Sequence, residues 1–248
     1  PRIGYSITRH GVAIVRQFER MGIYVANSSE GIQRSRDKLH ATQVLSTSHI
    51  PVPTTAYVRD WRDVERAIRQ VGGVPCVIKA AEGTQGSGVY LAHTEREASE
   101  LAWDLLEKGT QVLVQEYIKE SHGKDVRVLV VGGEVVASMR RRAHGREFRS
   151  NFHLGGSVEA FDLPEDYARI ARKAARILGL DIAGVDLLES NRGPLLLEVN
   201  SSPGLEGIEK ATGVNVAGHI MSHVVESHAF SSVDFDQLLA SKEGHGTL

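Results

Sequence analysis

Apolar positions along this chain recur with two spacings, the three-to-four spacing of amphipathic helices and the short apolar runs of buried strands. Helical spacing predicts helices over residues 11–21, 35–46, 60–70, 95–107, 167–178 and 216–229. Short apolar runs bounded by turn residues predict strands over residues 77–80, 89–92, 112–118, 126–131, 134–140, 182–189 and 194–200. The pattern therefore predicts an α/β (α+β) chain, in which the unit over residues 77–118 is mostly non-parallel.

The last two predicted strands form a hairpin across the turn residues at 191–193. With a three-residue loop, Ser190 faces Pro194, and counting back along both strands puts Asp186 opposite Glu198, with side chains about 5 Å apart. Asn200 lies two residues further on, so its side chain points to the same face.

Two carboxylates and an amide carbonyl on one sheet face repel each other and lose hydration, so their placement calls for a compensating cation. Hard oxygen donors suit Mg²⁺ or Mn²⁺, and substrate phosphates usually complete the coordination of such an ion. The alternative is that this face of the hairpin is simply exposed to solvent.

Composition narrows the class of protein. The 248 residues carry a net charge of −2, and 41% of them are hydrophobic, which suits a globular chain with no general attraction to nucleic acid or membrane. A single cysteine, Cys76, cannot form a disulfide within the chain, which fits a reducing compartment. It lies in an apolar run and is expected to be buried. We expect a cytoplasmic protein, because neither a membrane-spanning run nor a signal segment is present. The chain starts at Pro1, which suggests missing first residues, and residues 231–248 are expected to form a flexible tail.

A glycine-rich loop, residues 82–88, follows a strand that contains Lys79. Three glycines allow backbone N–H groups to approach an anion, and the lysine supplies a matching charge. A P-loop is disfavoured because Val89 and Tyr90 stand where Lys and Ser or Thr are required. The Rossmann fingerprint fails as well, since no glycine follows Gly88 at the required spacing. A flexible lid over phosphates and an ordinary loose turn remain as the two readings.

Taken in order, these motifs resemble the ATP-grasp ligases, and the segment at residues 200–210 resembles the RimK-type branch. The ordered set consists of Lys38, Lys79, the loop at residues 82–88, residues 115–118, Asp125, Arg127, residues 148–151, Asp186, Glu198 and Asn200. The resemblance covers residues 1 to about 228. It implies two α/β lobes that clasp ATP, with residues 1–34 as a remnant of an N-terminal α/β pre-ATP-grasp domain. Residues 35–230 would form the ATP-grasp domain, with a lid lobe at about 50–118 and a C-terminal lobe at about 119–230.

The chain departs from the family pattern at two places. Family members carry an additional N-terminal segment of about 60 residues, part of the α/β domain, which we expect to be missing from this chain. Leu154 also stands where an arginine is expected, which puts one phosphate or substrate contact in doubt.

The resemblance implies a role for each motif residue. ATP would be bound by Lys38, Lys79, Gly86, Ser87, Gly88, Glu116, Tyr117, Ile118, Asp125, Arg149, Ser150 and Asn151, with Arg149 and Asn151 acting in catalysis. Within this set the lysines would meet the phosphates, residues 116–118 would read the adenine, and Gln115 would be structural. Two Mg²⁺ or Mn²⁺ ions would be held by Asp186, Glu198 and Asn200. Considered singly, the lysines are more often surface charges, Asp125 could be a turn residue, and Arg127 could be an ion-pair partner.

The resemblance implies that the enzyme adds glutamate to the acidic C-terminus of ribosomal protein S6 through an acyl phosphate. The run Arg140, Arg141 and Arg142 would give a cationic entrance, although Arg141 should face the opposite side of the strand from its two neighbours. His219 and His223 could form a metal-ligand pair, but Ile220 stands where a zinc peptidase carries its glutamate. A ligase that acts on a small molecule or another protein, and a nucleotide-binding module without catalysis, remain as alternatives. A homo-oligomer is also expected.

Overall fold

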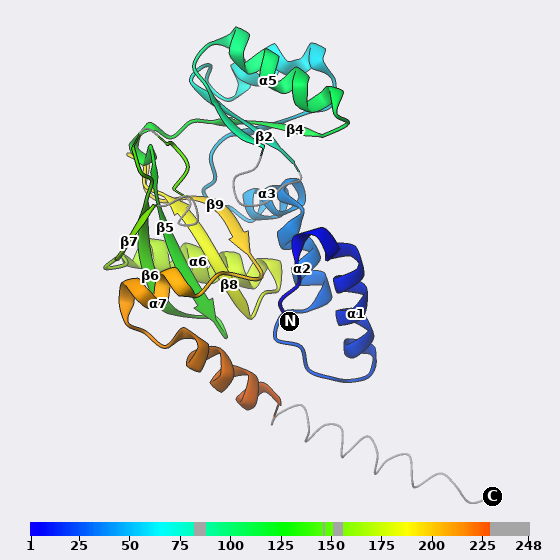
Figure 1. The fold of residues 1–248 in the computed structure, drawn as a ribbon, viewed down its shortest axis with the longest axis vertical. Helices are drawn as coiled ribbons and strands as arrows, with labels where there is room; N and C mark the ends of the chain where they lie inside the picture. Colours follow the sequence, from blue (N-terminus) through cyan, green and yellow to red (C-terminus); the bar gives the residue numbers. More distant parts are fainter. Residues whose placement is uncertain (82–87, 146, 151–155, 229–248) are drawn as a thin grey trace, which may run out of the picture.

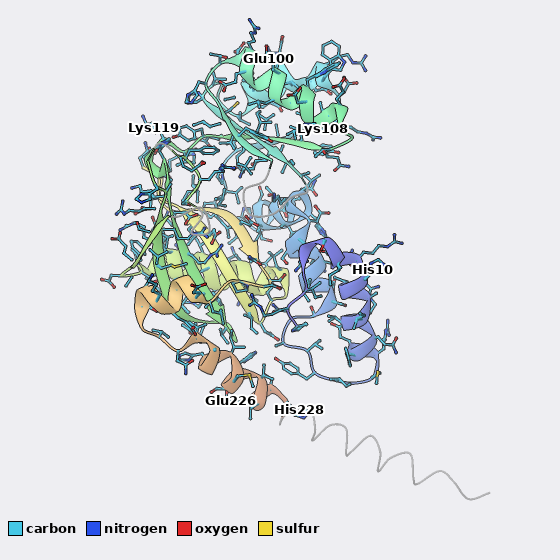
Figure 2. The ribbon with its side chains drawn as sticks, viewed as in Figure 1. His10, Glu100, Lys108, Lys119, Glu226 and His228 are labelled. Atoms are coloured by element: carbon cyan, nitrogen blue, oxygen red, sulfur yellow. The ribbon has the colours of Figure 1, made fainter. Side chains whose placement is uncertain are left out.

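In the computed structural model of this chain, residues 1–81, 88–145, 147–150 and 156–228 are described. They form two antiparallel sheets, one in each of two lobes, with helices on their outer faces (Figure 1). The chain passes between the lobes through the short 3-10 helix η3, Lys119–Ser121, where Figure 2 labels Lys119.

The upper lobe in Figure 1 is a four-stranded sheet in the order β1-β4-β2-β3. Its strands are Thr55–Val58, Val112–Glu116, Cys76–Ala80 and Val89–Ala92. The 3-10 helix η2, Trp61–Asp63, leads into α4, Val64–Gln70, and α4 packs with α5, Glu95–Glu107, on one face. Ile78 and Val114 lie fully buried beneath these helices. Alternate residues, including Lys79 and Gln115, therefore point to the opposite face, toward the second lobe.

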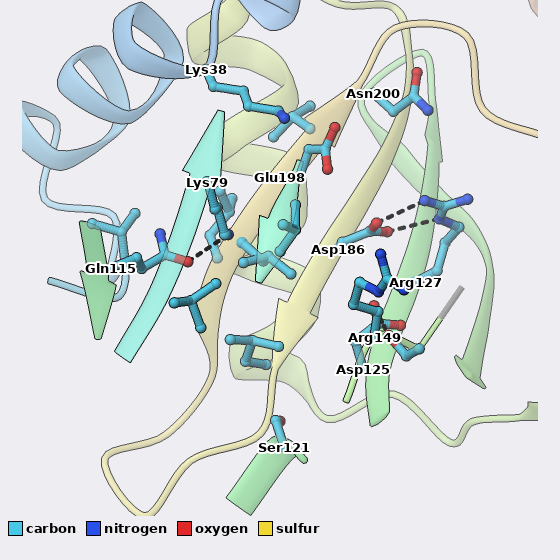
Figure 3. A pocket seen from close by; sticks show the side chains of 18 of the residues that line it. Lys38, Lys79, Gln115, Ser121, Asp125, Arg127, Arg149, Asp186, Glu198 and Asn200 are labelled. Carbon is cyan, nitrogen blue, oxygen red and sulfur yellow. Dashed lines mark hydrogen bonds and ion pairs between the residues drawn. The ribbon is translucent and has the colours of Figure 1, made fainter. Parts of the chain in front are cut away.

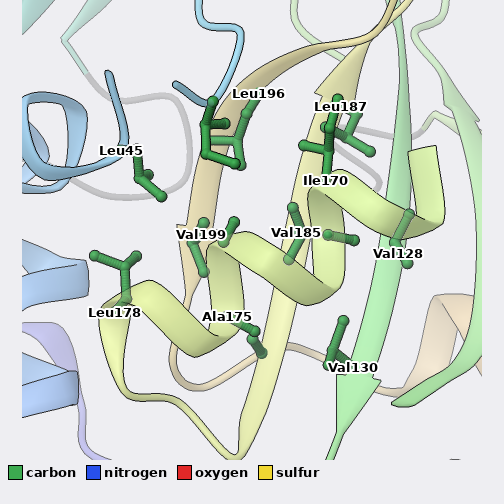
Figure 4. Close-up of a cluster of buried hydrophobic side chains, with 14 of the residues drawn as sticks. Leu45, Val128, Val130, Ile170, Ala175, Leu178, Val185, Leu187, Leu196 and Val199 are labelled. Carbon is green, nitrogen blue, oxygen red and sulfur yellow. The ribbon is translucent and has the colours of Figure 1, made fainter. Parts of the chain in front are cut away.

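The lower lobe is a five-stranded sheet in the order β7-β6-β5-β8-β9. Its strands are Ser157–Ala160, Glu134–Arg142, Lys124–Val131, Ile182–Leu188 and Leu195–Asn200. Helix α6, Glu165–Leu178, buries its apolar stripe against Val128, Val185 and their neighbours (Figure 4). Helix α7, Glu206–Thr212, packs on Leu129 and Met139, which lie on the other face. Beyond the area that α7 covers, this second face carries polar side chains.

The N-terminal part comprises the 3-10 helix η1, Tyr5–Ile7, followed by α1, Thr8–Arg20, α2, Ser29–Arg36, and α3, Lys38–Thr47. The predicted single helix over residues 35–46 is wrong at its start. Asp37 ends α2 and caps α3 by accepting a hydrogen bond from the backbone N–H of His40. Lys38 is consequently the first residue of a helix whose Leu45 packs into the core of the lower lobe.

Most predicted elements are present, and α5 and β3 have the predicted bounds. The helix at residues 216–228 agrees with the prediction as far as the described residues reach. Cys76 is fully buried as expected, and burial raises the pKa of its thiol to about 11. Strands β1 and β7 and helix α7 have no counterpart in the sequence prediction. Each is short, so its hydrophobic pattern is too brief to identify.

The hairpin of β8 and β9 pairs Asp186 with Glu198, as predicted. The predicted route to that register was wrong, because Leu188 pairs with Leu195, one residue away from the pairing that a three-residue loop would produce. The register shifts between Asp186 and Leu187, where Leu197 is the extra residue on β9. The bulge cancels the offset at the turn, so the two carboxylates lie opposite each other after all.

Candidate active site

A cavity of about 400 Å³ lies between the two lobes. Figure 3 shows Lys79 and Gln115 entering it from the upper sheet, Lys38 from α3, and Asp186, Glu198 and Asn200 from the lower sheet. The predicted site residues in the described part of the chain all line this cavity, apart from Gly88. Gly86, Ser87 and Asn151 lie outside the described residues.

The three predicted metal ligands differ in their surroundings. Asp186 is buried, whereas Glu198 is exposed and, among the described residues, has no hydrogen-bond or ion-pair partner. The Asn200 side-chain oxygen accepts a hydrogen bond from the backbone N–H of Ser202 at 2.8 Å, which leaves its second lone pair available. Two carboxylates and one amide oxygen form a hard donor set that fits Mg²⁺ or Mn²⁺ with phosphate or water oxygens completing the coordination. The described residues contain no group of three His, Cys, Asp or Glu side chains that could hold a metal by themselves.

Asp186 is neutralised by arginines from the neighbouring strands. The Arg127 guanidinium donates from Nε and Nη2 to the two carboxylate oxygens, both at 2.7 Å, and Arg141 Nη2 donates to Oδ2 at 2.7 Å. Burial alone would raise the pKa of Asp186, but the two guanidinium groups outweigh it and hold this pKa below its usual value. The expected compensating cation is therefore already provided in part by protein side chains, and the interpretation of Arg127 as an ion-pair partner is confirmed.

Arg141 also binds Asp125 through two hydrogen bonds, of 2.6 Å from Nε to Oδ1 and 2.5 Å from Nη2 to Oδ2. Ser150 donates its hydroxyl to the same Asp125 carboxylate at 2.5 Å. Arg141 and Asp125 are 4% and 2% exposed, so Asp125 belongs to a buried network. Its role therefore goes beyond that of a turn residue at the start of a strand, which was the alternative.

Lys79 is held in place by Gln115. Its ammonium donates to the Gln115 side-chain oxygen at 2.6 Å, and the Gln115 amide donates to Thr55 at 2.9 Å. Burial, and then the nearby Lys38, lower the pKa of Lys79 to about 8, while Glu198 acts in the opposite direction. Gln115 thus has a structural role, as expected, and that role is to position a cation in the cavity.

Glu116 lies at the connection between the lobes, and its carboxylate is already hydrogen-bonded to other parts of the protein. It accepts hydrogen bonds from Arg192 at 2.7 Å and from the backbone N–H of Thr54 at 3.2 Å. Partial burial acts to raise the pKa of Glu116, but these contacts outweigh it and lower the pKa. Glu116 therefore fastens the hairpin turn to the connection, and Tyr117 and Ile118 follow it along the cavity wall.

Arg149 reaches the cavity beside Asp125 and Arg127 (Figure 3). Its side chain donates to Glu147 from Nε at 2.9 Å and from Nη2 at 2.8 Å. The Arg149 hydrogen bonds lower the pKa of Glu147 to about 2. Gly88 has φ +70°, and a Cβ at this position would lie 2.9 Å from the Cβ of Ala80, so the end of the glycine loop passes close over β2.

The expected cationic entrance is not formed by the arginine run. Arg140 and Arg142 lie on the opposite face from Arg141, as predicted, and both donate to Glu159, while Arg140 also pairs with Glu189. Their charges are balanced by these carboxylates. His223 contacts Tyr24 at 3.3 Å rather than forming a metal-ligand pair with His219.

Two features of the site were missed by sequence reasoning. Arg141 was interpreted as a steering charge, yet it is the buried centre of the network. Asn27 bonds to the Ile182 backbone through its carbonyl and its amide, and to the Ser201 carbonyl, at 2.8–2.9 Å. It thereby ties the start of β8 to the segment after Asn200. A buried asparagine between an apolar and a polar stretch has no distinctive sequence pattern.

Comparison with known proteins agrees with this geometry. Residues 35–224 match the RimK-like ATP-grasp domain, and residues 1–32 match the RimK pre-ATP-grasp domain. A probable alpha-L-glutamate ligase of Rhodopirellula baltica is 52% identical over 99% of this chain and 61% of its own length. One from Methanococcoides burtonii is 50% identical over 92% of this chain and 75% of its own length. The chain therefore spans about two thirds of the length of these relatives.

Solved structures show the same fold. The ATP-grasp ligase PsnB, complexed with a precursor peptide and AMPPNP, has a TM-score of 0.69 at 22% identity and covers 90% of this chain and 68% of its own. A D-alanine–D-alanine ligase from Bacillus anthracis has a TM-score of 0.70 at 17% identity, over 92% of this chain and 78% of its own. None of the helices in the described residues is both long enough and apolar enough to span a membrane. The expected ATP-grasp fold is confirmed, and the chain belongs to the RimK-like ATP-grasp family of ligases.

Proposed function

We propose that this protein is an ATP-dependent α-L-glutamate ligase that joins glutamate to a carboxylate through an amide bond. The observation that carries the proposal is the cavity itself, in which Lys79 from the upper sheet and Lys38 from α3 meet Glu198 and Asp186 of the lower sheet. Cations on one side and hard oxygen ligands on the other suit a metal–polyphosphate. The names of the relatives support glutamate as the amino acid.

Each described residue has a role that its position supports. The two lysine ammonium groups would bind phosphate oxygens as point charges, and the backbone of Tyr117 and Ile118 would read the adenine. Asp186, Glu198 and Asn200 would hold one or two Mg²⁺ or Mn²⁺ ions, which neutralise charge on the β- and γ-phosphates when bound. Glu116 is already bound to Arg192, so we assign it the positioning of this connection.

The reaction then needs positioning and charge stabilisation rather than a protein nucleophile. An oxygen of the acceptor carboxylate attacks the γ-phosphorus of ATP, the bond to the β-phosphate oxygen breaks, and ADP leaves. The glutamate amine next attacks the acyl carbon, phosphate leaves, and the amine loses a proton as the amide forms. Arg149, which lines the cavity, is proposed to stabilise the transferred phosphoryl group, and Asn151 is proposed to assist. The loop at residues 82–88, with Gly86 and Ser87, would close over the phosphates.

The acidic C-terminus of ribosomal protein S6 is the proposed acceptor. It is supported by the resemblance of residues 200–210 to the RimK-type branch and by Lys38 and Lys79 in the cavity, which have no ion-pair partner in the part of the chain that the structure describes. Arg140, Arg141 and Arg142 no longer support it, because the described residues pair all three with carboxylates. The second candidate is a ligase for another peptide or a small molecule. PsnB is a structural neighbour that was solved with a precursor peptide bound.

The test is ADP release by the full-length protein, screened over amino acids with and without an S6-like acidic peptide. Glutamate should stimulate turnover, and mass spectrometry should show the peptide growing in steps of one glutamyl residue. Glu198→Gln should abolish both signals while leaving the fold intact, and Glu226→Gln, at an exposed position on the helix at 216–228, is the matched control. Turnover by Glu198→Gln near the wild-type rate would contradict the metal assignment. Addition of another amino acid with glutamate inert would contradict the substrate.

A further inference from the structure

Asp186 has almost no free capacity as a ligand in this structure. A carboxylate offers about four lone-pair positions. Arg127 and Arg141 together occupy both positions on Oδ2 and one on Oδ1 through hydrogen bonds of 2.7 Å. A single position on Oδ1 is left for a metal ion, and it lies beside the guanidinium of Arg127.

The charges around this position are already balanced. Arg127 and Arg141 offset Asp125 and Asp186, so that the buried network is neutral. Of the other charged groups that line the cavity, Arg2, Lys38 and Lys79 have no ion-pair partner among the described residues. Glu198 has none either. These four groups therefore sum to two positive charges, which do not attract a free divalent cation.

We infer that Arg127 is the resident counter-cation of Asp186 and competes with divalent metal for this carboxylate, so that the site takes up metal together with nucleotide phosphates rather than alone. The inference rests on the proposed function, in which Asp186 is a metal ligand. A metal ion about 2.1 Å from Oδ1 would lie within a few ångströms of the Arg127 guanidinium, where like charges repel strongly. The negative charge of a polyphosphate removes that repulsion and also occupies Lys38 and Lys79.

The opposite role for Arg127 is to orient Asp186 and so strengthen metal binding, as hydrogen-bond partners of metal ligands commonly do. The geometry favours competition, because Arg141 holds the same carboxylate independently and is itself fixed by Asp125. Loss of Arg127 would therefore leave Asp186 oriented, but would remove one positive charge next to the metal. The two roles predict changes of opposite sign.

The test measures Mn²⁺ binding to the full-length protein without nucleotide, from the free Mn²⁺ signal in electron paramagnetic resonance. Arg127→Met should bind Mn²⁺ about tenfold more tightly than wild type, whereas Arg127→Lys, which keeps the charge, should not. Arg140→Met is the matched control, because Arg140 lies on the opposite face and pairs with Glu189 and Glu159. Addition of ADP should tighten Mn²⁺ binding more in wild type than in Arg127→Met.

The effect must disappear in an Asp186→Asn background, where no carboxylate remains for Arg127 to block. If Arg127→Met does not fold, Arg127→Gln removes the charge while keeping a donor, and the same tightening is expected. Unchanged or weaker Mn²⁺ binding in a folded Arg127 variant would overturn the inference. That result would leave the proposed function standing as long as Glu198→Gln abolishes ligation.

Discussion

Removal of Arg141 should destabilise the protein far more than removal of its neighbour Arg142. Arg141 is 4% exposed and is hydrogen-bonded to two buried carboxylates, Asp125 and Asp186. Arg141→Ala leaves Asp125 with the Ser150 hydroxyl as its remaining described partner and leaves two carboxylates side by side in the interior. Loss of one partner from a buried ion pair costs about 3–5 kcal/mol. A change of this size lowers the Tm of a chain of this length by about 6–20 °C.

The measurement is thermal and urea denaturation of Arg141→Ala, Arg142→Ala and wild type. Arg142 is the matched control, since its side chain is 49% exposed and pairs with an exposed Glu159. Such surface pairs contribute little, and Arg142→Ala should leave Tm within about 2 °C of wild type. Equal shifts for the two variants would contradict the buried network.

Acid should narrow the difference between Arg141→Ala and wild type. Burial raises the pKa of Asp125 above its ordinary value, and Arg141 acts in the opposite direction, so removal of Arg141 should raise this pKa further. The stability contributed by a group with a raised folded-state pKa is present at low pH and is lost as the pH rises through that pKa. Because the rise is larger in Arg141→Ala, this variant gains more stability than wild type as the pH falls. The gap in Tm should therefore shrink as the pH is lowered from about 7 to about 5. A gap that widens with acid would exclude an unpaired carboxylate as its cause.

Three further predictions concern ATP binding and the strand ends. The pKa of Lys79 is lowered to about 8, so its charge is present below this pH and lost above it. ATP affinity should fall about fivefold between pH 8 and 9 in wild type, and Lys79→Arg should remove this dependence, as measured by calorimetry. Gly88→Val should raise the KM for ATP and lower kcat, because Gly88 has φ +70° and a Cβ there would lie 2.9 Å from the Cβ of Ala80. Unchanged kinetics would mean that the loop does not act on the nucleotide. Asn27→Asp keeps the acceptor but replaces two amide hydrogen bonds with repulsion from backbone carbonyls. Urea unfolding should show that the free energy of unfolding falls by about 2 kcal/mol or more. An unchanged midpoint would contradict the role of Asn27 in joining β8 to the segment after Asn200.

Hydrophobic spacing along the sequence determined most of the helices and strands, because their apolar faces repeat over many residues. It also determined the carboxylate pair of the hairpin, since Asp186 and Glu198 lie only 12 residues apart, on two strands that are joined by a single turn. Even so, the pairing depended on a bulge at Leu197 that no local pattern indicates. The motif order identified the family, and the family models agree with it.

The tertiary structure alone decided which charges meet. Arg127 and Arg141 reach Asp186 from strands β5 and β6, and Arg192 reaches Glu116 across 76 residues of chain. Such pairings depend on which strands are neighbours and which face each side chain takes. Sequence spacing describes only the alternation within one strand, so it could place Arg141 on the opposite face from Arg142 but could not identify Asp125 as its partner. For the same reason Arg141 was expected at the entrance of the site, whereas the packing of three strands buries it at the centre.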